Sequence, residues 1–125
     1  MRILVVDDQP EVAVSQTLLL RAHGYEADVC SESEKALALI EQMKPDVVLI
    51  DLAMPIVCGF DIVEKLEHCT EIRPRLIVAV TGFESPELRS KAAEAGFDLF
   101  LLKPLEFSQL QPAIEAARRS NHRPK

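Results

Sequence analysis

Polar residues stand at the ends of four apolar runs in this sequence, and their types suit phosphoryl chemistry. Asp7 and Asp8 follow one run, Asp51 and Thr81 end two others, and Lys103 follows the fourth. Brought together, three carboxylates would repel one another by about 4 kcal/mol for each pair at ~4 Å and an effective dielectric near ~20. Lys103 supplies one positive charge, and a divalent cation would supply the rest.

The candidate ligands are all oxygens, which favours Mg²⁺, with Mn²⁺ as the alternative, over zinc. Mg²⁺ keeps several waters and is bound through one or two carboxylates together with phosphate oxygens. A carboxylate can also attack phosphorus and form an aspartyl phosphate. Asp51 suits this nucleophile, while Lys103 and Thr81 suit groups that hold the oxygens of a transferring phosphoryl group.

Taken singly, each of these residues has a simpler explanation. An aspartate such as Asp8 or Asp51 is usually a turn residue or helix cap when it follows a strand. A lone threonine there usually bonds within a turn, and a lone lysine is usually solvated. Their joint occurrence at successive strand ends favours a functional cluster, because like charges gathered at such a place mark candidate sites.

The elements that would position these residues alternate along the chain. We expect strands at residues 2–6, 26–30, 46–50, 75–81 and 98–102, each followed by a helix. This alternation predicts βαβ units and a parallel sheet. Because the strand runs lack polar alternation, we predict a doubly wound α/β sandwich, covered on both faces, with its site at the carboxyl ends of the strands.

Local signals predict several helix boundaries. Gly24 suits the end of the first helix, and Ser85 followed by Pro86 suits the start of the fourth. Ser31 and Glu34 offer a capping box for the second helix.

Two patterns concern the first and last helices. One face of the first helix is predicted to carry Val12, Ser15, Leu19 and Ala22. Pro112 lies inside the last helical pattern, where it removes a backbone donor and should kink or delay the helix.

Composition argues against several other classes of protein. The net charge of −6 disfavours direct binding to nucleic acid, whose phosphates carry the same sign. The three cysteines, Cys30, Cys58 and Cys69, lack the C-x-x-C spacing of a zinc site, and their odd number argues against a disulfide framework. No run approaches the ~20 apolar residues of a membrane span, and the start MRILVVDD is too acidic for a signal peptide. We therefore expect a cytoplasmic protein without membrane contact.

Four motifs together resemble the receiver domain of two-component response regulators, a CheY-like family. The motifs are VVDDQPEV at 5–12, DLAMPIVCG at 51–59, VTG at 80–82 and LLKPL at 101–105. The resemblance implies a flavodoxin-like fold, in which five helices flank a five-stranded parallel sheet of order 2-1-3-4-5. It covers residues 1–120 and leaves a short tail at 121–125.

The resemblance also implies roles at the phosphoryl site. Asp51 would be the phosphoacceptor. Asp8 and Asp51 would ligate Mg²⁺ directly, together with the backbone carbonyl of Ala53. Asp7 would act partly through water.

Further residues would respond to the phosphoryl group. Lys103 would pair with one of its oxygens, and Thr81 would move to hydrogen-bond it. Phe100 would be the switch aromatic that swings inward, although an aromatic on a strand also has a plain packing role. The Lys103–Pro104 bond is expected to be cis, a conformation that is cheap only before proline.

The partners follow from the same resemblance. A sensor histidine kinase or a histidine phosphotransfer protein would donate the phosphoryl group, and the domain would catalyse only its own phosphorylation and dephosphorylation. The added charge would bias a surface made by the fourth helix, fifth strand and fifth helix, which would dimerise or bind a downstream protein. We expect a stand-alone regulator rather than a receiver cut from a longer protein.

Three alternatives remain. A haloacid-dehalogenase-like phosphatase or phosphotransferase would need an acid two residues after its nucleophile, where Ala53 stands. A flavodoxin-like cofactor binder would need a phosphate loop rich in Gly, Ser and Thr, whereas DDQPEV is acidic. A receiver-like scaffold that is never phosphorylated would lack Asp51 or Lys103, and both are present.

Two departures from the family pattern concern the lifetime of a phosphorylated state. Ala53 stands two residues after Asp51, and Phe83 stands two residues after Thr81. In the family these positions flank the route of the hydrolytic water. Neither side chain can orient a water by hydrogen bonding, so we expect a long-lived phosphorylated state.

Overall fold

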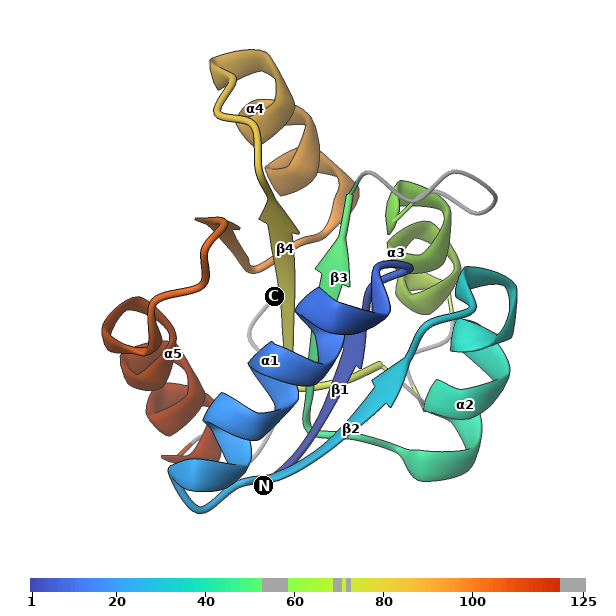
Figure 1. Ribbon diagram of the computed structural model, residues 1–125. Helices are drawn as coiled ribbons and strands as arrows, with labels where there is room; N and C mark the ends of the chain where they lie inside the picture. Colours follow the sequence, from blue (N-terminus) through green and yellow to red (C-terminus); the bar gives the residue numbers. More distant parts are fainter. Residues whose placement is uncertain (53–58, 69–70, 72, 120–125) are drawn as a thin grey trace.

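Five parallel strands form one sheet with helices on both faces (Figure 1). The computed structural model describes residues 1–52, 59–68, 71 and 73–119. The strand order is β2-β1-β3-β4-β5, which confirms the predicted order 2-1-3-4-5. Every neighbouring pair is parallel, as the alternation of strands and helices requires.

The bounds of the elements lie close to those expected from the sequence. The strands are β1 (Arg2–Val6), β2 (Glu26–Cys30), β3 (Val47–Asp51), β4 (Leu76–Thr81) and β5 (Leu99–Leu102). The helices are α1 (Pro10–Ala22), α2 (Ala36–Met43), α3 (Gly59–Glu67), α4 (Pro86–Ala95) and α5 (Phe107–Arg119). None of the described helices is long and apolar enough to cross a bilayer.

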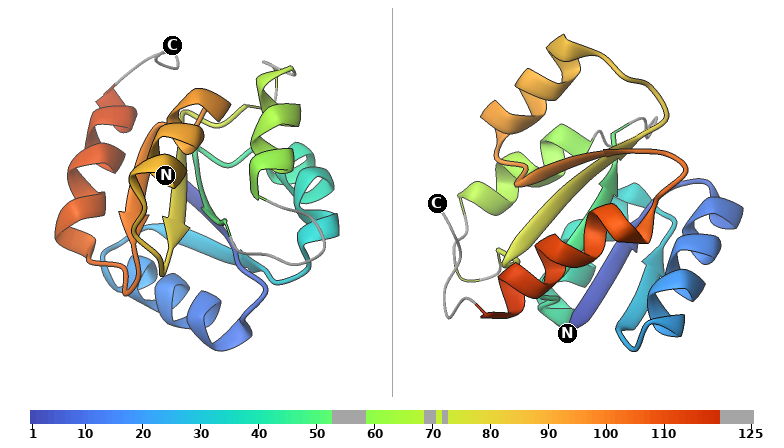
Figure 2. Two further views of the ribbon diagram at one scale, coloured as in Figure 1. Left: turned by 90° about the horizontal axis from the view of Figure 1, so that it is seen from above. Right: turned by 90° about the vertical axis from the view of Figure 1, so that its left-hand side faces the viewer.

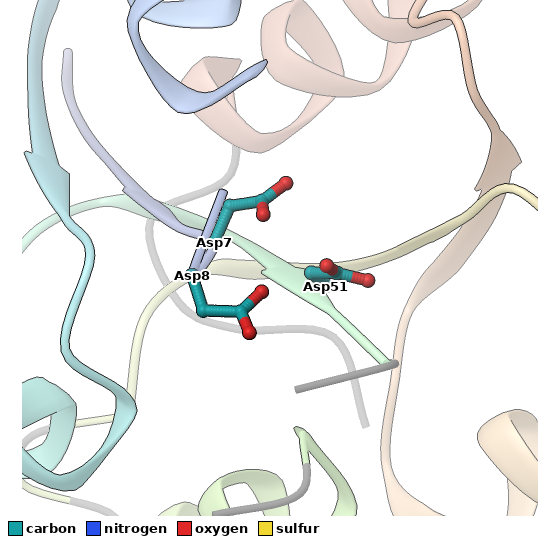
Figure 3. Close-up of side chains that lie close together, drawn as sticks. All are labelled: Asp7, Asp8 and Asp51. Atoms are coloured by element: carbon teal, nitrogen blue, oxygen red, sulfur yellow. The ribbon is translucent and has the colours of Figure 1, made fainter. Parts of the chain in front are cut away.

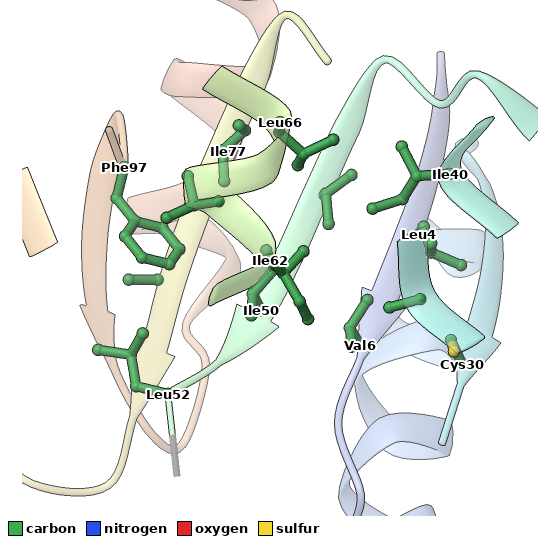
Figure 4. Close-up of a cluster of buried hydrophobic side chains, with 14 of the residues drawn as sticks. Leu4, Val6, Cys30, Ile40, Ile50, Leu52, Ile62, Leu66, Ile77 and Phe97 are labelled. Carbon is green, nitrogen blue, oxygen red and sulfur yellow. The ribbon is translucent and has the colours of Figure 1, made fainter. Parts of the chain in front are cut away.

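Two apolar clusters fill the space between the sheet and its helices. Figure 2 shows α1 and α5 on one side of the sheet and α2 and α3 on the other. The cluster on the side of α2, α3 and α4 includes Leu4, Ile40, Ile50, Ile62 and Ile77 (Figure 4). The cluster on the side of α1 and α5 includes Ile3, Leu20, Leu49, Val78 and Ile114. All residues of β3 and β4 are buried, because helices cover these strands on both sides.

The second helix does not begin with the predicted capping box of Ser31 and Glu34. A short 3-10 turn, Ser33–Lys35, precedes α2, and its N-cap residue Glu32 makes no side-chain capping bond. The backbone N–H of Lys35 instead donates to the carbonyl of Glu32 at 2.9 Å, so the tighter turn satisfies groups that a cap would otherwise serve.

The predicted cap of the fourth helix is confirmed. The Ser85 side chain accepts a hydrogen bond from the backbone N–H of Leu88 at 3.2 Å, and Pro86 occupies the first helical position. This cap fixes where α4 begins relative to the end of β4.

The first and last helices pack differently from what their patterns suggest. The buried residues of α1 are Ala13, Gln16, Thr17 and Leu20 rather than the face that holds Val12 and Leu19. The Thr17 hydroxyl donates to the Ala13 carbonyl at 2.8 Å, which lets a polar side chain lie in the core.

Helix α5 runs from Phe107 through Pro112, so the predicted delay is wrong. Its buried residues Leu110, Ile114 and Ala117 hold the helix against the sheet on both sides of the proline.

Aromatic and charged side chains join α5 to the segment between α1 and β2. The Tyr25 hydroxyl donates to Oε2 of Glu115 at 2.6 Å, and the His23 ring stacks on Phe107 with 3.7 Å between ring centroids. Burial raises the pKa of the Tyr25 hydroxyl, and the hydrogen bond and negative charge of Glu115 raise it further. The phenol therefore resists ionisation in the folded protein.

Tyr25 is the one tyrosine of the chain, so its ionisation can be followed by ultraviolet absorbance. We expect the folded protein to form phenolate at a higher pH than the urea-unfolded chain, which should titrate near ~10. Because the folded-state pKa is raised, the contribution of Tyr25 to the free energy of unfolding should be fully present below pH ~10. This contribution should be lost as the pH rises further. Glu115→Gln should lower the tyrosine pKa partway toward its ordinary value; identical titration curves for this variant and the wild type would contradict the assignment.

Candidate functional site

The sheet register brings the polar strand ends together. Val6 pairs with Ile50, so the residues that follow, Asp7 and Asp51, lie at the same level on neighbouring strands. Asp51 pairs with Val80, which places Thr81 one residue further along the next strand. Thr81 in turn pairs with Leu102, the residue before Lys103. Parallel pairing alone therefore gathers these side chains at one edge of the sheet.

Three carboxylates point into one space at this edge (Figure 3). Asp7, Asp8 and Asp51 each offer an oxygen that lies within 4.8 Å of the others. Asp7 is 1% exposed and Asp51 is 5% exposed, whereas Asp8 is half-buried. Water therefore screens their mutual repulsion poorly, and a positive charge is needed to offset it.

Lys103 supplies that charge from the end of β5. Its Nζ donates to Oδ2 of Asp7 at 3.0 Å and to Oδ2 of Asp51 at 3.3 Å. Burial lowers the pKa of Lys103, but the hydrogen bond to Asp7 and the charges of Asp51 and Asp7 outweigh burial and raise the pKa above its ordinary value. One ammonium against three carboxylates leaves two negative charges, which is the charge that one divalent cation offsets.

The carboxylates of the cluster differ in their hydrogen bonds. Oδ1 of Asp7 accepts from the backbone N–H of Gln9 at 2.9 Å, and its Oδ2 accepts from Lys103, so both oxygens are engaged. Among the residues that the structure describes, the Asp8 carboxylate has no hydrogen bond or ion pair. Asp8 is therefore more accessible to a cation than Asp7.

Gly59 lets α3 begin against the end of β3. A Cβ at this position would lie 2.8 Å from Cγ2 of Ile50 and 3.1 Å from the carbonyl oxygen of Asp51. A larger residue would push the start of α3 away from the acidic cluster. The predicted metal ligand Ala53 precedes this helix and lies outside the described residues.

Thr81 and Phe100 occupy the two strands beyond Asp51. The Thr81 hydroxyl, which is buried, accepts a hydrogen bond from the backbone N–H of Phe83 at 3.2 Å. Phe100 is half-buried on β5, and the Arg89 guanidinium lies 4.5 Å from the centroid of its ring. The peptide bond between Lys103 and Pro104 is cis.

The structure thus brings four of the predicted site residues, Asp7, Asp8, Asp51 and Lys103, into one cluster. Sequence reasoning did not single out Arg89. An arginine on an exposed helix carries no local signal of its partner, and its contact with Phe100 depends on how α4 lies against β5.

Comparison with known proteins agrees with this architecture. A family model described as the response regulator receiver domain matches residues 3–115. The chain is 32% identical over 120 residues to the DNA-binding response regulator MtrA of Mycolicibacterium smegmatis, an alignment that covers 96% of the chain and 51% of MtrA. The chain spans about half the length of the curated relatives it matches.

Solved receiver structures superimpose closely on the chain. The chemotaxis protein CheY4 of Vibrio cholerae is 25% identical with a TM-score of 0.83, covering 93% of this chain and 97% of CheY4. The BeF3-activated N-terminal receiver domain of RstA from Klebsiella pneumoniae is 25% identical with a TM-score of 0.86, covering 96% of this chain and 100% of that domain. The sequence-based expectation of a CheY-like fold is therefore confirmed.

Removing the Lys103 ammonium should destabilise the fold, because two buried carboxylates would lose the positive charge of Lys103. In the absence of divalent ions we expect Lys103→Met to lower the free energy of unfolding by about 2 kcal/mol, below the full value for a buried pair because the lysine side chain is 19% exposed. Adding Asp51→Asn should recover part of the loss by removing one of the repelling charges.

Urea unfolding in the presence of a chelator measures this effect. Lys91→Met, which removes an exposed lysine of α4, is the matched control. Equal losses of stability in Lys103→Met and Lys91→Met would show that the ammonium is not needed to balance the carboxylates.

Proposed function

The chain belongs to the response regulator receiver domain family, and on that premise we propose that it accepts a phosphoryl group on Asp51. The donor would be a phosphohistidine on a sensor histidine kinase or a histidine phosphotransfer protein. The observation that carries the proposal is the contact of Lys103 with both Asp7 and Asp51 beside Asp8. A cluster of this charge at the carboxyl edge of a parallel sheet suits the capture of a phosphoryl group.

Asp51 would act as the nucleophile. A carboxylate oxygen of Asp51 would form the bond to phosphorus while the bond between phosphorus and the donor imidazole nitrogen breaks, and the leaving imidazole would take up a proton. The Lys103 ammonium would hold one oxygen of the phosphoryl group, and the Thr81 hydroxyl would donate to another. The domain would thus modify only itself, and loss of the phosphoryl group to water would reset it.

The donor set of the acidic cluster suits Mg²⁺, with Mn²⁺ as the alternative, since all candidate ligands are oxygens and two negative charges are left over. Asp8 and Asp51 would hold the ion directly, with the Ala53 carbonyl as a further ligand. Asp7 would act through water, because both of its carboxylate oxygens already accept hydrogen bonds. When bound, the ion would offset the charge that builds on the phosphoryl oxygens.

The signal would leave the site through Thr81 and Phe100. On phosphorylation the Thr81 hydroxyl would give up its bond with the Phe83 N–H, and Phe100 would swing inward. The surface of α4, β5 and α5 would then dimerise or bind a downstream protein.

We place the domain in the cytoplasm, where kinases of this kind present their phosphohistidine. We also propose that these 125 residues contact proteins rather than nucleic acid, since their net charge is −6. MtrA is named as a DNA-binding response regulator, but this chain aligns with only 51% of MtrA.

Incubation with acetyl phosphate tests the phosphoacceptor directly. With Mg²⁺ we expect one phosphoryl adduct by intact mass, labile to base, and without divalent ions we expect far less. Asp51→Asn should remove the adduct, whereas Asp61→Asn, at an exposed position of α3, should form it like the wild type. Equal labelling of Asp51→Asn and the wild type would overturn the assignment of Asp51.

The phosphorylated state should be long-lived, because neither Ala53 nor the exposed Phe83 can orient a water. We expect the double variant Ala53→Asn, Phe83→Glu to lose its phosphoryl group about tenfold faster, a change of ~1.4 kcal/mol in the barrier. Phosphate release after removal of the donor measures the rate, and Ala53→Val with Phe83→Leu is the apolar control. Equal rates in the wild type and the double variant would refute a long lifetime caused by these residues.

A further inference from the structure

We propose that Arg89, held in place by Glu84, is a positioning residue that restrains the inward movement of Phe100. The proposal rests on the switching role of Phe100 given above and adds to it a regulating contact from α4. Three observations carry it: the stacking of Arg89 on Phe100, the ion pair of Arg89 with Glu84, and the position of Glu84 next to Thr81.

The first observation is the contact between a cation and an aromatic ring. The Arg89 guanidinium lies 4.5 Å from the centroid of the Phe100 ring, inside the ~6 Å range of cation–π attraction. Phe100 is half-buried, so the ring is partly shielded from water on the sheet side and covered by the guanidinium on the α4 side. This attraction exists only while the ring lies beneath Arg89, and a swing away from the guanidinium would forfeit it.

The second observation is that the guanidinium is itself fixed. Nη2 of Arg89 donates to Oε2 of Glu84 at 3.0 Å and to Oε1 at 3.2 Å. An exposed arginine without such a partner would sample many rotamers and would restrain a neighbour weakly. Glu84 and Phe100 together narrow the range of rotamers that the Arg89 side chain samples.

The third observation is the position of Glu84 in the chain. Glu84 lies three residues after Thr81, in the segment between β4 and α4, and the intervening Phe83 bonds to the Thr81 hydroxyl. When Thr81 moves toward a phosphoryl group, this short segment must adjust, and Glu84 moves with it. Glu84 and Arg89 therefore link the phosphoryl site to Phe100. We expect the contacts of Arg89 with Glu84 and with Phe100 to break on activation.

Beside this contact the surface is hollowed, so neighbouring atoms leave room for the guanidinium to depart. A hollow of about 460 Å³ along β5 is lined by Arg89, Phe100, Leu102, Lys103, Glu106 and Gln109. Arg89 is thus a removable restraint and not part of a packed core.

The chain offers a matched control on the same helix. The Lys91 ammonium lies 4.9 Å from the centroid of Phe60, which belongs to α3. Removing this second cation–π contact changes the charge of α4 in the same way but leaves Phe100 untouched. Arg89→Met and Lys91→Met can therefore be compared directly, because methionine keeps an apolar stem in each case.

The experiment measures the affinity of the Mg²⁺-loaded full chain for beryllofluoride, which imitates a phosphoryl group on the acceptor aspartate. Arg89→Met should bind about two- to fivefold more tightly than the wild type, the size expected when an exposed cation–π contact no longer opposes the active state. Glu84→Gln should shift the affinity in the same direction by less, and Lys91→Met should match the wild type.

Ring resonances of ¹³C-labelled phenylalanine supply a readout that loss of stability would not move. Five phenylalanines give few signals, and Phe100→Leu identifies the relevant one. Without beryllofluoride, the Phe100 signal of Arg89→Met should already lie partway toward its saturated position, while thermal unfolding midpoints stay equal to that of Lys91→Met.

The outcomes separate the two proposals. If the wild type binds beryllofluoride and Arg89→Met behaves like Lys91→Met, or binds more weakly, the restraint is overturned and the phosphoacceptor function stands. If the wild type binds no beryllofluoride and takes no phosphoryl group from acetyl phosphate, both proposals fail. Tighter binding by Arg89→Met together with the shifted Phe100 signal supports the restraint.

Discussion

Repulsion among three carboxylates is the constraint on which this structure depends. Two of them, Asp7 and Asp51, are almost fully buried, and the Lys103 ammonium contacts both. Asp7 follows β1 and Asp51 ends β3, at the centre of the sheet, whereas Lys103 follows the edge strand β5. The lysine side chain therefore reaches past the end of β4 to balance charges two and three strands away. The end of the edge strand is held in place by electrostatic attraction as well as by backbone pairing.

This arrangement offers a route by which a change at the centre of the sheet would reach its edge. The Lys103 ammonium is shared between two carboxylates, so any new negative charge on Asp51 must redistribute its contacts. Phe100 lies three residues before Lys103, on β5, beneath the Arg89 guanidinium of the preceding helix α4. The neighbouring strand end carries Thr81, whose hydroxyl is tied to the segment that leads into that helix. The acidic cluster, β5 and α4 are thus linked by contacts between single side chains. Each of these contacts can be broken at a modest cost in free energy.

Much of the fold and of the acidic cluster could be predicted from sequence, because both follow from rules that act along the chain. Alternating strand and helix patterns require a parallel sheet, and parallel strands bring Asp7, Asp51 and Lys103 to one edge whatever the details of packing. Predictions failed where tertiary contacts decide. The buried face of α1 includes Gln16 and Thr17, which an apolar pattern does not reveal. The entry to α2 uses a 3-10 turn in place of a side-chain cap, and the stacking of Arg89 on Phe100 depends on the placement of α4.

Only one register of β5 against β4 places both Phe100 and Lys103 where they lie in this structure. Phe100 faces the cluster under α4, whereas its neighbours Leu99 and Leu101 face the cluster under α5. A slip of one residue would turn every side chain of β5 to the opposite side. The aromatic ring would then be exchanged for a leucine, and the ammonium would be drawn about 3.3 Å along the strand axis, away from its carboxylates. A register error in this four-residue strand would therefore break the contacts of Lys103 with the carboxylates as well as the packing of β5.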